Sequence, residues 1–342
     1  MKNKEITNKP VYTISSAIVD WVARIAERVG ELKNVDRNNQ DLHLRKANRL
    51  RSIHSSLAIE NNTLTLGQVT DIINGKRVLG PPREIEEVRN AYMSYEHLTD
   101  YDPYKVRDFL KAHQLMTQGL VSDAGKFRST GVGVFDGSNL VHLGASYQFV
   151  PQLVDDLLRW AKQSDLHPLV KSSVVHFEIE LIHPFMDGNG RMGRLWQTLI
   201  LSKWQPLFAW LPIETMVYEN QQGYYDALQV SQKSTDSQRF IEFMLEAIWK
   251  TLNEFNEVEI PDIFPDINTD MFSITEIDFL AVIAGYLSKN ETITNQKARS
   301  LTGKSADSVK KYMSKFVQAG LLLTEGDNKG RKYKLNKKQK RL

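Results

Sequence analysis

The chain has 342 residues, so we expect two or more structural units that each bury an apolar interior. Hydrophobic residues make up 41% and charged residues 25%, the balance of a soluble globular protein, and the lack of cysteine excludes disulfides, thiolate catalysis and cysteine-ligated zinc. No apolar run approaches the roughly 20 residues that a spanning helix needs, so we expect a cytoplasmic protein without a membrane partner.

Charge is unevenly distributed along the chain. The total is +3, whereas residues 302–342 hold 12 Lys and Arg against 3 Asp and Glu. This local excess of nine positive charges leaves −6 for the rest of the chain. A basic end on an acidic body indicates a separate role for the C-terminus.

Most of the sequence has the periodicity of amphipathic helices. Apolar residues at three- and four-residue intervals predict a helix over residues 15–32. The segment 127–143 differs, because β-branched and aromatic residues surround Asp136-Gly137, which predicts a short β-hairpin. The other predicted helices of the body are 45–59, 85–98, 103–120, 150–163, 169–182, a helix ending near 202, one beginning at 223, and 239–256.

The C-terminal region has a different order of elements. Two prolines and several turn formers interrupt the helical pattern before it, and we interpret residues 259–271 as a linker. Beyond it we predict helices over 275–287, 295–301 and 305–319, and strands over 321–324 and 331–335. This order is typical of a winged helix-turn-helix, which we assign to residues 272–342.

Basic side chains in this region make DNA a possible partner. They suit phosphate contacts on a duplex, although winged helices also serve dimerisation and protein docking, and these alternatives stay open. The residues concerned are Lys310, Lys311, Lys315, Lys329, Arg331, Lys332 and Lys334.

The segment HPFMDGNGRMGR, residues 183–194, concentrates polar and glycine residues between two apolar helices. Gly188 and Gly190 let the backbone approach an anion, and a helix that begins near Asn189 adds its positive end. Arg191 and Arg194 are three apart, so they share a helix face and can grip successive phosphates. The pattern predicts a polyphosphate site.

Two further residues of the segment bring chemistry to this site. Asp187 supplies a hard oxygen ligand, and Mg²⁺ commonly takes one or two carboxylates together with substrate phosphates. His183 in its neutral form can accept a proton from an attacking hydroxyl near pH 7. Phe185 is expected to point into the core and anchor the loop.

The segment resembles the Fic-domain signature H-x-F-x-[DE]-G-N-G-R-x-x-R, and every specified position is met. The resemblance extends over roughly residues 12–255, with GKFR at 125–128 and the hairpin resembling the Fic flap. It implies a helical N-terminal region over residues 1–100, a Fic catalytic core over 101–258, and a mainly α fold with a small hairpin flap.

The resemblance implies a protein adenylyltransferase that moves AMP from ATP onto a Ser, Thr or Tyr hydroxyl. His183 would be the catalytic base and Asp187 would hold Mg²⁺. Gly190 matches the adenylylating branch, because a similar branch that phosphorylates its target has Lys at this position. The nucleotide-binding residues implied are Gly188, Asn189, Gly190, Arg191, Arg194, Tyr224 and Tyr225, of which the two tyrosines could equally be core residues.

Residues 56–61, SLAIEN, resemble the Fic inhibitory motif [ST]-x-x-x-E-[GN]. The implied mechanism is that Glu60 pairs with Arg194 and blocks the region of the γ-phosphate. The alternative is a solvated glutamate at a helix end. In some family members the same glutamate supports removal of AMP, so the reverse activity stays open.

The expected partner is a protein substrate of unknown identity, with self-modification and a homodimer as further possibilities. The edge of the hairpin over residues 130–141 could pair with an extended target segment, or it could be covered by its own domain. A second function class also stays open, in which the chain is a DNA-binding regulator whose nucleotide site only senses ATP.

Overall fold

The computed structural model describes residues 6–35, 41–136, 139–254, 272, 274–326 and 331–336. The chain divides into two compact units, Met1–Leu252 and Asn253–Leu342. The linker predicted over residues 259–271 lies outside the described residues, and the boundary between residues 100 and 101 stays a prediction.

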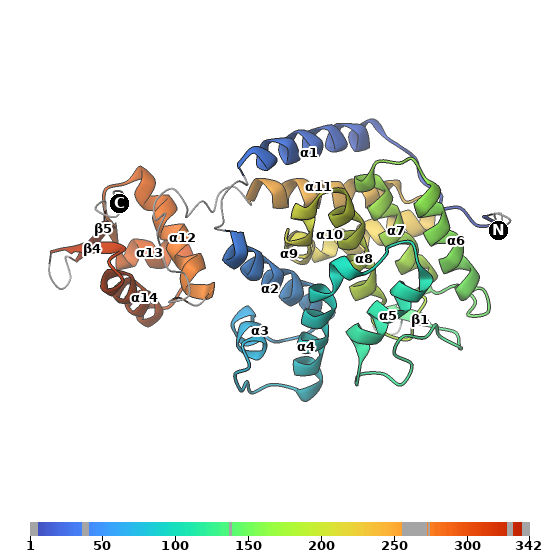
Figure 1. The fold of residues 1–342 in the computed structure, drawn as a ribbon, viewed down its shortest axis with the longest axis horizontal. Coiled ribbons are helices and arrows are strands. Elements are labelled where there is room, and N and C mark those ends of the chain that lie inside the picture. Colours follow the sequence, from blue (N-terminus) through green and yellow to red (C-terminus); the bar gives the residue numbers. More distant parts are fainter. Residues whose placement is uncertain are drawn as a thin grey trace. The chain divides into compact units, whose positions relative to one another are not determined.

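The larger unit is mainly α-helical (Figure 1). Its elements are α1 (Ser16–Val35), α2 (Asp41–Ile59), α3 (Leu66–Ile73), α4 (Pro82–Glu96), η1 (Leu98–Asp100), α5 (Val106–Thr117), β1 (Gly133–Asp136), β2 (Asn139–Leu143), α6 (Val150–Gln163), α7 (Pro168–Ile182), α8 (Asn189–Trp204), η2 (Pro206–Ala209), α9 (Ile213–Glu219), α10 (Gln221–Ser234) and α11 (Gln238–Glu254).

Helices α7 and α8 form the centre of this unit. Most side chains of both helices are buried, and these include polar and charged residues such as His176, Arg191 and Arg194. The two helices pack closely against each other, α6 packs against α7, and α5 packs against α8 (Figure 1). The twelve-residue segment 183–194 therefore begins at the end of one central helix and continues into the other.

The predicted elements of the body are present with shifted ends. The hairpin is an antiparallel pair of β1 and β2 with an irregularity in register between Val134 and Phe135. The sequence prediction lacked α3, α9 and the two short 3₁₀ helices. Helix α3 has only eight residues, and its start depends on a local capping box in which Thr65 and Gln68 bond each other's backbone.

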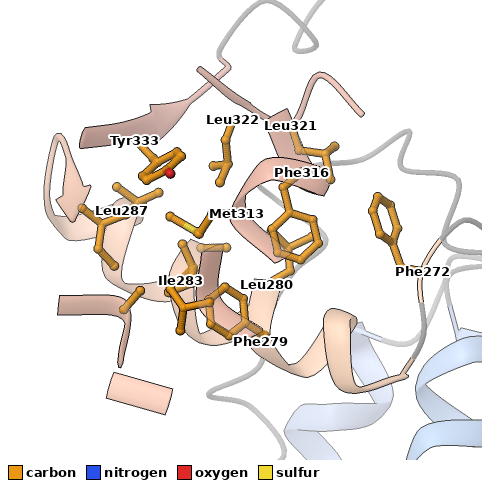
Figure 2. Close-up of a cluster of buried hydrophobic side chains, with 14 residues drawn as sticks. Phe272, Phe279, Leu280, Ile283, Leu287, Met313, Phe316, Leu321, Leu322 and Tyr333 are labelled. Atoms are coloured by element: carbon orange, nitrogen blue, oxygen red, sulfur yellow. The ribbon is translucent and has the colours of Figure 1, made fainter. Parts of the chain in front are cut away.

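The smaller unit contains α12 (Ile274–Lys289), β3 (Ile293–Thr294), α13 (Asn295–Thr302), α14 (Ala306–Gln318), β4 (Leu322–Glu325) and β5 (Lys332–Leu335). The strands form an antiparallel sheet in the order β3-β5-β4. The core lies between the helices and this sheet, where Phe279, Met313 and Tyr333 converge (Figure 2). The two-residue strand β3 was missing from the sequence prediction.

No helix in the described part of the chain is long and apolar enough to cross a membrane.

Candidate active site

The loop between α7 and α8 turns on two residues with left-handed backbone angles. His183 caps the C-terminus of α7 with φ 53° and ψ 63°, and Gly188 precedes α8 with φ 88°. A glycine adopts this conformation readily, whereas a histidine does so at a cost of about 1–2 kcal/mol. The surrounding structure must therefore hold His183 in place.

Phe185 and Asn189 close the loop from inside. The Asn189 side chain accepts a hydrogen bond from the Phe185 backbone N–H at 2.8 Å and donates one to the Phe185 carbonyl at 2.9 Å. The Phe185 ring is fully buried, which confirms the predicted anchor. The Asn189 side chain is therefore used by the loop itself, and only its backbone amide could serve the predicted phosphate contact.

His113 of α5 supports the same loop, and its ring stacks on Phe185 with centroids 3.6 Å apart. The backbone N–H of Gly125 donates to Nδ1 at 2.9 Å, so Nε2 carries the proton and donates to the Asp187 carbonyl at 3.0 Å. Burial lowers the pKa of His113 to about 4. The neutral ring is thus a fixed bridge between residue 125 and the segment 183–194.

The His183 imidazole is held at the end of α7. Its Nδ1 lies 3.4 Å from the Glu180 carbonyl, which can only accept a hydrogen bond. With Nδ1 donating there, the acceptor of the neutral ring is Nε2. This tautomer is the one a general base needs if the proton arrives at Nε2.

Arg191 and Arg194 lie beside this loop on α8, with 4% and 3% of their surfaces exposed. Arg191 donates to Asp187 at 2.8 Å, yet its Nε and one terminal nitrogen have no partner among the described residues. One terminal nitrogen of Arg194 is likewise without a partner in that part of the chain. Buried guanidinium N–H groups without acceptors favour an anionic ligand.

Arg194 is already held by the end of α2. It donates to Glu60 at 2.7 Å and to the hydroxyl and carbonyl of Ser56 at 3.0 Å each. Burial acts to lower the pKa of Arg194, but the nearby negative charge, with Glu60 first, outweighs burial and raises it. The ion pair that the sequence predicts between Glu60 and Arg194 is present.

Gly190 is the point of closest approach to this ion pair. A Cβ atom placed there would meet Oε1 of Glu60 at 2.2 Å and a terminal nitrogen of Arg194 at 3.1 Å. Real Cβ atoms essentially never come this close to another atom. The Glu60 carboxylate therefore lies directly against the backbone of Gly190.

Both oxygens of the Asp187 carboxylate have cationic partners. Oδ1 accepts from Arg191, and Oδ2 accepts at 2.8 Å from Arg83, which comes from α4. The Arg83 side chain is 57% exposed and that of Asp187 is 34% exposed. The Arg83 contact was not predicted, since an exposed arginine on a surface helix carries no sequence signal.

The two tyrosines of α10 lie in different environments. Tyr224 is 1% exposed and its hydroxyl lies 3.1 Å from Nε2 of His176, so burial favours the core alternative for this residue. Tyr225 is 43% exposed, and its hydroxyl donates to the Ile59 carbonyl at 3.2 Å. Tyr225 thus lies beside the end of α2 that carries Glu60.

Three of the residues that shape the site lie far from the signature in sequence. His113, Arg83 and Arg128 reach the loop across 74, 104 and 55 residues. Only Arg128 had a signal, through its place in GKFR. Together with the two central helices, these contacts build the loop and the adjacent histidine that the sequence predicts as a polyphosphate site with a base beside it.

Comparison with known proteins agrees with this class. Residues 103–201 match the model of the Fic/DOC family. A crystal structure of a Fic family protein from Desulfovibrio desulfuricans G20 is 40% identical, with a TM-score of 0.70 over 97% of this chain and 99% of that chain. The chain therefore belongs to the Fic family, whose members are mostly nucleotidyltransferases.

More distant relatives are protein adenylyltransferases. Protein adenylyltransferase fic-1 of Caenorhabditis elegans is 28% identical over 198 residues, which is 52% of this chain and 36% of that protein. The structure of Fic-1 (residues 134–508) from the same organism is 22% identical, with a TM-score of 0.58 over 70% of this chain and 71% of that chain, and supports the fold alone. The chain spans less than half the length of the curated relatives it matches.

Proposed function

We propose that this chain is a protein adenylyltransferase, which transfers AMP from ATP to a Ser, Thr or Tyr hydroxyl of a protein and is held in check by Glu60. The observation that carries the proposal is the pair of buried arginines on α8, the helix that follows His183, with N–H groups that have no partner among the described residues. A site that only senses ATP would need the arginines but not the histidine.

The residues present fit ATP and Mg²⁺. The guanidinium nitrogens of Arg191 and Arg194 that have no partner in the described part of the chain, and the first-turn amides of α8, would bind phosphate oxygens. Asp187 would hold Mg²⁺, which supplies charge neutralisation on the phosphates when bound. A single carboxylate suffices for this, because substrate phosphates and water provide the other ligands.

In the proposed reaction the target hydroxyl attacks the α-phosphorus of ATP. His183 accepts the hydroxyl proton, a bond forms between the hydroxyl oxygen and the α-phosphorus, and the bond to the β-phosphate breaks. Pyrophosphate leaves, and AMP remains on the target. Gly190 supports AMP as the transferred group, because the resemblance associates Lys at this position with phosphate transfer.

Glu60 acts as the brake in this proposal. Its carboxylate takes one terminal nitrogen of Arg194 and lies against Gly190, so the negative charge stands where a phosphate of ATP would approach. Two charges of the same sign cannot share this site without strong repulsion. Removal of AMP by the same site remains a further possibility of the proposal.

The test uses ATP labelled at either the α- or the γ-phosphate and measures the label on the chain itself and on lysate proteins. It compares wild type, Glu60→Gly and Glu60→Gly/His183→Ala. We expect label from the α position alone, about 10- to 100-fold more with Glu60→Gly, given the strength of hydrogen bonds between charged groups. Loss of the His183 base should lower transfer by about 10²- to 10⁴-fold.

Glu60→Gln is the matched control, because it keeps the shape of the side chain and removes its charge. The label transferred by Glu60→Gln should lie between that of wild type and that of Glu60→Gly if the charge and the volume of the side chain both contribute to the inhibition. Label from the γ position would replace the proposal with phosphate transfer. No label in any variant, with ATP still bound, would favour the ATP-sensing regulator.

The β1–β2 hairpin is proposed as the place where a target segment docks. The two strands pair only with each other among the described residues, so each has one edge without a strand partner. Val134→Pro removes one backbone donor of β1, which by its register faces His142 of β2, so the variant disturbs the hairpin itself. Target labelling by Glu60→Gly/Val134→Pro should fall while ATP binding stays, and unchanged labelling would remove the docking proposal.

We further propose that the smaller unit is a winged helix that binds duplex DNA. On α14, Lys310 and Lys311 are exposed while Val309, Met313 and Phe316 enter the core, so one face presents charge. Lys315 does not belong to this face, because it pairs with Glu276 at 2.7 Å. Lys329 lies outside the described residues.

Binding of a DNA duplex at several salt concentrations tests this second function. Lys310→Ala/Lys311→Ala should weaken binding. The slope of the binding constant against salt concentration should also decrease, by the amount expected for the loss of about two phosphate contacts. Lys111→Ala/Lys233→Ala removes the same charge from exposed positions of the larger unit and should leave binding unchanged. Equal affinities of the two double variants would point to a role in protein docking.

A further inference from the structure

Arg128 lies at the base of the β1–β2 hairpin and is 2% exposed. A buried guanidinium is normally paired with a carboxylate, because an isolated buried charge is costly. Arg128 forms no ion pair within the described part of the chain, and burial lowers its pKa. Its partners are backbone carbonyl groups, and their positions suggest what it does.

One set of partners surrounds the candidate base. Nε of Arg128 donates to the His183 carbonyl at 2.6 Å, a terminal nitrogen donates to the Ile182 carbonyl at 3.3 Å, and the backbone N–H of Arg128 donates to the Pro184 carbonyl at 3.0 Å. Three consecutive carbonyls therefore bond to a single residue. The Ile182 carbonyl is one of those that the end of α7 leaves without helical partners, where a cation is favourable, and His183 and Pro184 follow the helix directly.

The other set of partners belongs to the two legs of the hairpin. One terminal nitrogen donates to the Thr130 carbonyl at 2.8 Å, before β1 begins, and the other donates to the Ala145 carbonyl, after β2 ends. The planar guanidinium fixes the directions of these bonds relative to each other. The same rigid group thus joins both legs of the hairpin to residues 182 and 183.

We propose that Arg128 is a positioning residue that fixes the positions of His183 and the hairpin relative to each other. His183 needs such support because its left-handed backbone is unfavourable for a side chain of its type. Arg128 touches neither ATP nor the reacting hydroxyl in this proposal. It acts by holding the base on one side and the surface that receives the target segment on the other.

This proposal rests on the proposed function, in which His183 is the base and the hairpin receives the target. Its consequences differ from those of the phosphate-binding arginines. Loss of Arg128 should lower kcat and raise KM for a protein target, while KM for ATP stays within about twofold of the parent, because Arg191 and Arg194 are untouched.

The experiment compares Arg128→Lys and Arg128→Met in the Glu60→Gly background. Lysine keeps the charge but cannot hold four carbonyls in fixed directions. We therefore expect kcat to be highest in the parent, about tenfold or more lower in Arg128→Lys, and lowest in Arg128→Met. Arg107→Lys and Arg107→Met are the matched controls, since that side chain is 86% exposed, and both should match the parent.

A milder pair of variants covers the case in which Arg128→Met does not fold. A Cβ atom at Gly144 would lie 3.0 Å from a terminal nitrogen of Arg128 and 3.2 Å from Cβ of His183, so Gly144→Ala should displace the guanidinium slightly. Gly131 belongs to the opposite leg and has nothing within 4 Å of such an atom. Gly144→Ala should lower kcat severalfold, and Gly131→Ala should not.

Hydrogen exchange supplies a readout that does not depend on transfer. In Arg128→Lys, amides over residues 129–146 and 182–185 should exchange faster than in the parent, with residues 189–204 unchanged. Slow exchange in both segments, or a fall in ATP binding as large as the fall in kcat, would overturn the positioning role. If the parent transfers no AMP, the proposed function fails, and the exchange result still decides whether Arg128 joins the two segments.

Discussion

The two sides of the segment 183–194 are held by chemically different contacts. On the hairpin side, Arg128 and His113 bond to backbone groups and are buried. On the side of α2 and α4, Glu60 and Arg83 form ion pairs with Arg194 and Asp187 and are partly exposed. Carbonyl and amide partners cannot leave their site, whereas an exposed charged side chain can rotate into water.

This difference indicates a division of roles. Contacts to backbone on the hairpin side fix the shape of the loop, so they are expected in every state of the site. The ion pairs on the other side occupy the groups that ATP and Mg²⁺ would use, so they must open for the proposed reaction. The N-terminal helices therefore act on both proposed ligand groups, with Glu60 on a phosphate-binding arginine and Arg83 on the carboxylate.

The largest expected effect comes from a crossed comparison of Arg128→Met and Arg194→Met. Arg128→Met leaves buried carbonyls without donors and should lower the free energy of unfolding by about 2–4 kcal/mol. Arg194→Met leaves Glu60, which is 38% exposed and can be hydrated, and one buried carbonyl, that of Ser56, so it should cost less, about 1–2 kcal/mol. ATP binding should show the reverse order, with a loss of about 10- to 100-fold for Arg194→Met alone.

Urea unfolding with and without ATP measures both quantities in the same samples. Arg107→Met, which removes an exposed arginine, controls for the substitution itself. If Arg194→Met destabilised the chain as much as Arg128→Met, the distinction between a fixed side and a releasable side would be lost.

His113, on the hairpin side of the site, should make the stability of the folded chain depend on pH. Its pKa is about 4 in the folded chain against 6.5 as the ordinary value, so between these pH values the unfolded chain binds a proton that the folded chain does not. The His113 contribution is fully present above pH 6.5 and is lost as the pH falls toward 4, by about 3 kcal/mol in total.

Unfolding measured from pH 7.5 to 4.5 in wild type and His113→Gln tests this effect. Glutamine keeps one donor and one acceptor but does not titrate, so its stability should fall less steeply with falling pH. His97→Gln is a suitable control, because His97 is exposed and pairs only with Asp100 among the described residues. Equal slopes for wild type and His113→Gln would show that the ring is not held neutral.

The parts of the site that the sequence predicted are those encoded locally. Residues 183–194 are contiguous and match a complete pattern, and Glu60 belongs to a six-residue pattern, so neither needed knowledge of the fold. His113 and Arg83 had no such pattern. Their roles depend on which helices pack beside the loop, and this packing brings together residues 74 and 104 positions apart.

Local encoding also explains which helices and strands could be predicted from the sequence. Long amphipathic helices such as α1 and α6 have a strong period, so they were predicted with small shifts at their ends. Helix α9 has seven residues and β3 has two, too few for a period to emerge. Tyr224 shows the remaining limit, because a tyrosine on a helix gives no sign of whether its ring faces a ligand or the core.

The smallest expected effect concerns Arg83 and the metal. Its pair with Asp187 is partly exposed, so it should be worth up to about 1 kcal/mol, and Arg83→Ala should tighten metal binding by up to about fivefold. Titration with Mn²⁺, followed by electron paramagnetic resonance in the presence of ATP, measures this directly. Arg89→Ala, on the same helix with a similarly exposed pair to Glu86, should change nothing. Weaker Mn²⁺ binding after Arg83→Ala would mean that Arg83 holds Asp187 in a metal-binding position, and α4 would then belong with the fixed side of the site.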